Sequence, residues 1–171
     1  LPKRVDEIRQ TRGFGWEQTL DRFQLLAAIS YVGRDAELNP DGTVLRLAES
    51  GVHDDSASLA EENLVRELLL GTAALYRSGR VILGACCQFI RFNRIFTPRD
   101  SQNSFSGQQL AGCGVSLGWK TDAYQLAGDW AIASTGGQAG ALRLGGTWSD
   151  IVTRITLRGY QHHFFAPHGR V

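Results

Sequence analysis

The sequence predicts an all-β fold, an antiparallel up-and-down segment of a transmembrane β-barrel with about 7–8 strands and an open, partial barrel shape. Three observations predict it. Apolar side chains alternate with small or polar ones through the second half of the chain. Tight and longer connections take turns along the sequence. No apolar run approaches the roughly 18 residues that a membrane helix needs, so a membrane crossing would have to use strands.

Period-two alternation is the strongest of these signals, because successive side chains of a strand point to opposite faces. Leu126 and Trp130 alternate with Gln125 and Asp129, for example, so one face is bulky and apolar while the other is small or charged. Four consecutive segments show this separation: residues 109–119, 122–134, 139–148 and 151–162.

The cost of placing charge in lipid assigns the two faces. An arginine at the lipid-facing midplane costs about 2–4 kcal/mol, so the charged face is predicted to line the barrel interior. The predicted lumen-facing residues are Gln125, Asp129, Arg143, Arg154 and Arg158. The predicted lipid-facing residues are Leu126, Trp130, Leu142, Leu144, Ile155 and Leu157. The predicted interface aromatics, which fall beside tight turns as in an aromatic girdle, are Trp119, Tyr124 and Trp148.

The connections support a barrel rhythm. Two-residue turns are predicted at Lys120-Thr121 and Ser149-Asp150, because the apolar positions change parity across each of them. We expect the long connection 93–107 to be extracellular and Ser149-Asp150 to be periplasmic. The full series of predicted connections is 34–42, 49–62, 77–79, 93–107, 120–121, 135–138 and 149–150.

The first half of the chain is less regular. Residues 1–20 are predicted to be an irregular lead-in, and 21–171 to hold the strands of a single domain. Residues 21–33 and 80–92 read as strands, and 43–48 as a short one.

One segment, residues 54–70, is compatible with either a helix or a strand. Ser58 and Glu61 have the spacing of a capping box, and Leu64 with Leu68 fits a helical stripe. A strand over 64–76 is favoured, because Gly71 and the turn-like residues 77–79 that follow suit a hairpin.

The two ends of the chain indicate a segment that is incomplete at both ends. Residues 1–5 carry charge without the apolar core of a signal peptide, and residues 166–171 read as a loop stopped in mid-course. A closing, aromatic last strand is not found in the sequence.

Several short motifs resemble a known family. They are Glu62-Asn63-Leu64-Val65-Arg66-Glu67, Phe105-Ser106-Gly107, Gly128-Asp129-Trp130-Ala131, Gly137-Gln138-Ala139, Leu157-Arg158-Gly159-Tyr160 and Phe164-Phe165-Ala166-Pro167-His168-Gly169. From about residue 20 onward the chain resembles the Bacteroidota-type outer-membrane proteins in which a large β-barrel follows a helix-hairpin-helix region. Asp129 departs from the family, which often carries Glu in a Gly-Glu-x-Ala run. The resemblance implies a membrane barrel and no particular activity, and no DNA-binding role is carried over, because the helix-hairpin-helix pattern is missing.

Candidate chemistry is sparse. The three cysteines, Cys86, Cys87 and Cys113, form no C-x-x-C pair and are predicted to be small packing residues. His162, His163 and His168 are predicted to lie in a solvated loop, as is His53 with its neighbouring aspartates, so no metal site is expected. Asp129 and the lumen arginines are either a binding cluster or, more commonly for a barrel, charges that pair with one another.

These patterns predict an integral barrel of the bacterial outer membrane, acting as a pore, transporter or anchor, with the lipid bilayer as its partner. No catalytic motif is present, so we expect no enzyme activity and no cofactor. The balance of 18 Lys and Arg against 17 Asp and Glu gives no field for nucleic acid. The alternative is a soluble β-barrel or sandwich that binds a small apolar ligand, since a charged face in water would produce the same alternation.

Overall fold

The computed structural model describes residues 12–47, 63–97, 105–148, 151–161 and 164. This part of the chain is all-β and contains ten strands in one antiparallel, up-and-down sheet that does not close into a barrel. The predicted all-β, antiparallel up-and-down topology is confirmed, and the open sheet is consistent with the predicted partial barrel, with ten strands in place of the expected 7–8. No helix in the described ranges has the length and apolarity to span a membrane.

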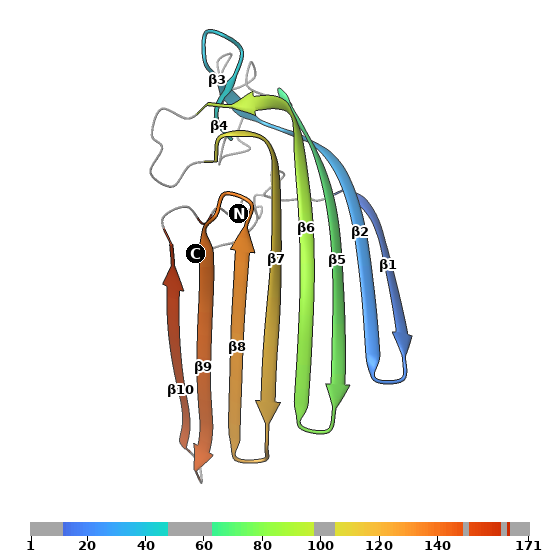
Figure 1. Ribbon diagram of the computed structural model, residues 1–171, viewed down its shortest axis with the longest axis vertical. Helices are drawn as coiled ribbons and strands as arrows, with labels where there is room; N and C mark the ends of the chain where they lie inside the picture. Colours follow the sequence, from blue (N-terminus) through green and yellow to red (C-terminus); the bar gives the residue numbers. More distant parts are fainter. Residues whose placement is uncertain (1–11, 48–62, 98–104, 149–150, 162–163, 165–171) are drawn as a thin grey trace, which may run out of the picture.

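Eight strands form the main sheet, each antiparallel to its neighbours (Figure 1). In spatial order they are β1 (Gly13–Leu20), β2 (Phe23–Arg34), β5 (Val65–Ser78), β6 (Val81–Phe96), β7 (Gly107–Lys120), β8 (Tyr124–Ala133), β9 (Gln138–Trp148) and β10 (Ile151–Tyr160). The short strands β3 (Ala36–Leu38) and β4 (Val44–Leu47) form a hairpin beside this path. β1 and β10 are therefore the two edges of the main sheet.

Tight and longer connections lie at opposite ends of the strands, as the sequence predicts (Figure 1). We call one end the turn end; it holds residues 21–22, 79–80 and 121–123. The other is the loop end; it holds the β3–β4 hairpin and residues 134–137. Each pair of strands thus crosses from the loop end to the turn end and back.

The turn between β7 and β8 differs from the prediction. Trp119 lies opposite Leu126, whereas a two-residue turn would have placed it opposite Asp122. The turn is longer because the Thr121 hydroxyl accepts a hydrogen bond from the Tyr124 backbone N–H at 3.0 Å, and Thr121 N–H donates to the Tyr124 carbonyl at 2.8 Å. Odd residues of β7 still face even residues of β8, so the predicted faces are unchanged. Between β9 and β10 the expected register is found, with Trp148 opposite Ile151.

The prediction that residues 1–20 are irregular is wrong for residues 13–20, because Gly13–Leu20 is strand β1. It pairs with β2 along its whole length, from Gly13 opposite Ser30 to Leu20 opposite Phe23. Gly13 and Gly15 weaken the local strand signal, and the pairing supplies the hydrogen bonds that fix the extended backbone. The ambiguous segment is strand β5 from Val65 onward, because β2 and β6 pair with it on both sides; residues 54–62 lie outside the described ranges.

A buried apolar cluster lies at the loop end, where the β3–β4 hairpin covers one face of the sheet. Its members are Ala36, Val44, Val65, Ile90, Phe92, Phe96, Phe105 and Leu110. Figure 1 shows β6 bending toward β3 and β4 at this end. Val44 pairs with Phe96 in a parallel bridge, and the Arg94 guanidinium donates to the carbonyls of Leu64 and Gly42, each at 3.0 Å. The β3–β4 hairpin thus contacts β6 directly, and Arg94 of β6 links it to the segment that leads into β5.

The hairpin turn is ordered by its own polar residues. The Thr43 backbone N–H and hydroxyl both donate to the Asp41 carboxylate, at 2.9 and 2.7 Å. These hydrogen bonds hold the pKa of Asp41 below its ordinary value, because they favour the ionised carboxylate. Residues 34–42 were predicted to be a connection only, but they include strand β3.

A buried ion pair lies beside the cluster. Arg34, at the end of β2, donates from Nε and Nη2 to the two carboxylate oxygens of Glu67 on β5, at 3.2 and 3.1 Å. The two side chains are 7% and 0% exposed. Such a two-point contact compensates for removing both charges from water only while both partners are present.

Candidate functional site

The strand pairing separates the side chains of the main sheet into two faces, because directly opposite residues share a face. The five residues predicted to face a lumen all lie on one of them. Asp129 lies opposite Ala141, which in turn lies opposite Arg158, and Gln125 is joined in the same way to Arg154 through Gly145. Arg143 shares this face because it lies opposite Ala127.

The residues predicted to meet lipid share the other face. Leu126 lies opposite Leu144, which lies opposite Ile155; Leu142 lies opposite Leu157. Trp119, Tyr124, Trp130 and the backbone position of Trp148 belong to the same set. We call this the apolar face, and the one with Asp129 the polar face. The division between faces is the one predicted from sequence, while the contact of either face with lipid or water stays a prediction.

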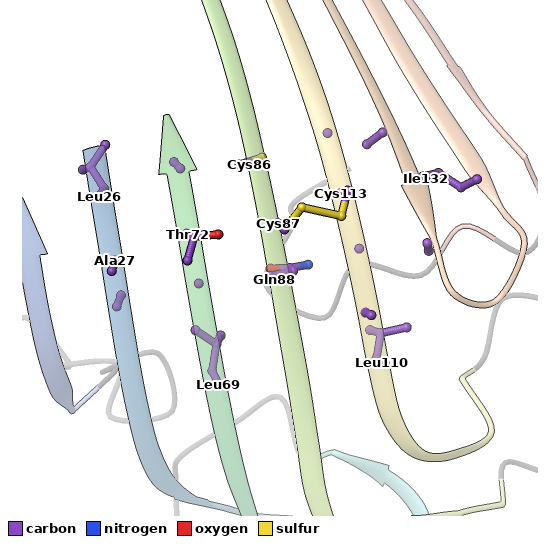
Figure 2. Close-up of a pocket in the computed structure, with 18 of the residues that line it drawn as sticks. Leu26, Ala27, Leu69, Thr72, Cys86, Cys87, Gln88, Leu110, Cys113 and Ile132 are labelled. Atoms are coloured by element: carbon purple, nitrogen blue, oxygen red, sulfur yellow. A yellow bond between two sulfur atoms is a disulfide. The ribbon is translucent and has the colours of Figure 1, made fainter. Parts of the chain in front are cut away.

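Two adjoining troughs lie on the polar face. On each strand, the first and the last residue that line a trough belong to the polar face. Residues between these positions also contribute atoms to the lining. The first trough encloses about 650 Å³ and extends from β1 to β8 (Figure 2). The second encloses about 530 Å³ and extends from β5 to β10. The polar face is therefore the hollow side of the sheet.

Small side chains create the first trough. Its polar-face lining is dominated by Gly15, Ala28, Gly71, Ala73, Gly112, Gly114, Ala131 and Ala133. Gln88 lies over Gly112: a Cβ atom at Gly112 would come within 3.7 Å of the Gln88 amide nitrogen. The alternation of small residues was visible in the sequence of β7 and β8. Its continuation onto β1, β2 and β5 was not, because that depends on the pairing of strands far apart in the chain.

The second trough carries charge. Arg143 and Asp129 form an ion pair at 3.4 Å, with both side chains about half exposed. Arg158, Tyr160 and Ser116 line the same trough. Three of the residues predicted to be lumen charges, Asp129, Arg143 and Arg158, thus lie around one trough.

The apolar face is well exposed and almost free of charge. In the described part of the chain, the exposed large apolar side chains lie on this face, with the exception of Ile82, Ile95, Val152 and Tyr160. In the regularly paired part of the main sheet, the only charged residues on this face are Arg66 and Arg91, both near the loop end. The Trp130 indole N–H donates to the Gln138 side chain at 3.3 Å, also toward that end.

The cysteines differ from the prediction that all three are simple packing residues. Cys87 on β6 lies directly opposite Cys113 on β7, and the two form a disulfide (Figure 2). Their Cα atoms are 4.1 Å apart. No sequence spacing indicates this bond, because it depends on the register between two strands. Cys86 is free and exposed, and its position is on the polar face.

Alkylation of the folded, unreduced protein should therefore attach one label to the chain, at Cys86. After unfolding and reduction, three labels are expected. Mass spectrometry of both samples counts the labels, and peptide mapping assigns them. Three labels on the unreduced, unfolded protein would show that Cys87 and Cys113 are not bonded.

Metal binding finds no support in the described ranges, where no group of three His, Cys, Asp or Glu side chains is placed to hold an ion. His53, His162, His163 and His168, with the aspartates beside His53, lie outside those ranges.

Comparison with known protein families, curated proteins and solved structures finds no match. The resemblance to Bacteroidota-type outer-membrane barrels therefore stays a prediction.

Proposed function

We propose that the chain forms part of an integral outer-membrane β-barrel, with the apolar face against lipid and the polar face toward a water-filled interior. The observation that carries this proposal is the composition of the apolar face. It exposes Trp119, Trp130, Leu144, Ile155 and their neighbours over eight strands without a charge away from the loop end. A monomeric soluble protein rarely exposes an apolar surface of this extent.

Strand length and aromatic placement support the same proposal. A tilted strand needs about 9–11 residues to cross a bilayer. All main strands except β1 reach at least ten residues, and β6 has 16. Trp119 and Tyr124 lie at the turn end, where the tilted rings of Phe23 and Tyr76 are also in contact, with centroids 4.8 Å apart. Aromatic side chains at the strand ends are typical of membrane barrels.

The soluble alternative requires the opposite arrangement. A soluble barrel that binds an apolar ligand has bulky apolar residues on its hollow side and polar residues outside. Here the hollow side carries Asp129, Arg143 and Arg158 in its second trough, whereas most of the exposed large apolar side chains are on the other side. The curvature of the sheet thus favours the membrane proposal over the soluble one.

Thiol labelling tests the proposal in intact cells that produce the protein. In a background with all three native cysteines replaced by serine, Thr135→Cys places a thiol at the loop end and Asp122→Cys places one at the turn end. A membrane-impermeant maleimide should label position 135 in intact cells, and both positions after the cells are broken. The protein should also remain with the membrane fraction after alkaline washing.

The matched positions make the outcome decisive, since both lie in short connections of the same strand, β8. Labelling of both positions in intact cells, or recovery of the protein in the soluble fraction, would contradict the proposal. Labelling of position 122 alone would reverse the orientation and refute the assignment of the loop end to the outside.

A further inference from the structure

Positive charge gathers on the polar face outside the buried loop-end cluster. Five basic residues lie there: Arg77, Lys120, Arg143, Arg154 and Arg158. Asp129 is the acidic residue among them. Glu17 shares the polar face but lies on β1, at the far edge of the sheet, where its carboxylate accepts a hydrogen bond from Gln24 at 2.6 Å.

Three of the basic residues are neighbours across two strands. Arg143 on β9 lies opposite Thr156, so Arg154 and Arg158 on β10 flank it diagonally. Diagonal neighbours on one face are separated by roughly 7–8 Å, which is within reach of long side chains. Like charges at this spacing repel each other, and an anion placed between them removes that repulsion.

The carboxylate of Asp129 compensates the charge of only one of these three arginines. Asp129 pairs with Arg143, and no carboxylate in the described part of the chain forms an ion pair with Arg154 or Arg158. The expectation that the lumen charges pair with one another thus holds for Arg143 and Asp129. In the described part of the chain, it does not hold for Arg154 and Arg158.

The hollow beside these arginines has the size of a small-molecule site. Arg143 and Arg158 line the second trough, whose volume of about 530 Å³ lies in the range usual for ligand pockets. Its floor is formed by small residues, including Gly84, Gly114 and Ala139, and Tyr160 stands on one side. An apolar body fits such a floor, and a phosphate or carboxylate head fits the guanidinium groups, which offer paired N–H donors.

We infer that the second trough binds small organic anions, with the phosphate or carboxylate head held by Arg143 and Arg158 and the apolar body on the small-residue floor. Asp129 competes with the ligand for Arg143 and so tunes its affinity. This inference rests on the proposed function in one respect, that the polar face is in water.

Titration calorimetry tests the inference: phenyl phosphate is added to the full chain in detergent micelles, and the heat of binding is measured. Saturable binding is expected, tighter than that of inorganic phosphate because of the apolar ring, and weaker at high salt. Arg158→Gln should weaken binding about tenfold, since it removes a charge-assisted contact. Asp129→Asn should strengthen binding, because it frees Arg143. Arg91→Gln, on the other face, is the matched control and should leave binding unchanged.

The gain expected for Asp129→Asn cannot arise from misfolding, which makes it the sharpest part of the test. No saturable binding by the native chain, an equal loss in Arg158→Gln and Arg91→Gln, or weaker binding by Asp129→Asn would each overturn the inference. Insertion of the same variants into lipid vesicles is measured separately. Failure to bind with normal insertion refutes the anion site alone, whereas binding without insertion refutes the membrane proposal.

Discussion

Replacing Leu144 by arginine should prevent the chain from inserting stably into lipid vesicles. Leu144 lies near the middle of β9 on the apolar face, between Leu126 on β8 and Ile155 on β10, and it is 43% exposed. An arginine there would have to enter hydrocarbon, at a cost of about 2–4 kcal/mol near the midplane. Leu126→Arg, directly opposite, should act in the same way, and the double variant should be more severe still.

Ala141→Arg is the matched control on the same strand. Ala141 belongs to the polar face and lies opposite Asp129, so an arginine there gains a neighbouring carboxylate and stays in water. Folding into vesicles, followed by gel mobility and protease protection, compares the variants. Equal insertion of Leu144→Arg and Ala141→Arg would remove the basis for assigning the apolar face to lipid.

Glu67→Leu should lower the free energy of unfolding by about 3–5 kcal/mol, because it leaves the Arg34 guanidinium buried without its carboxylate. The two side chains form a two-point contact at 3.1 and 3.2 Å beside the loop-end cluster. Unfolding by urea of the chain refolded in detergent, followed by tryptophan fluorescence, measures the loss.

The double variant Arg34→Met with Glu67→Leu separates charge from packing. It replaces both charged groups with apolar ones of similar length, so most of the lost stability should return. If the double variant is as unstable as the sum of the two single variants, the loss is due to side-chain packing and the ion pair does not contribute as we expect. An exposed pair, Glu37 with Arg46 at 2.7 Å, is the comparison, and its removal should cost less than about 1 kcal/mol.

Local sequence determined the strands of the second half and the two faces they present. The alternation of Leu126 and Trp130 with Gln125 and Asp129 follows from the backbone of a strand alone, so no knowledge of partners was needed. The same is true of the change of parity across the turns, which survived even though the β7–β8 turn is longer than expected. The positions of Arg143, Arg154 and Arg158 on one face were fixed in this way.

Tertiary pairing decided what the local pattern left open. Residues 13–20 have a weak strand signal and became β1 through hydrogen bonds to β2. The disulfide joins residues 26 positions apart, and Arg34 meets Glu67 across 33 positions, so both depend on register between strands. The hairpin that covers the loop end likewise needed Phe96 and Arg94 of β6 as partners.

The troughs show the same division. The sequence placed small residues such as Gly112 and Gly114 on one face of β7, which is a local property. That this face is the hollow one, shared from β1 to β10, follows from the curvature of the whole sheet and from the hairpin packed on it at the loop end. Curvature arises from the sum of many strand pairings, and no single segment of the sequence encodes it.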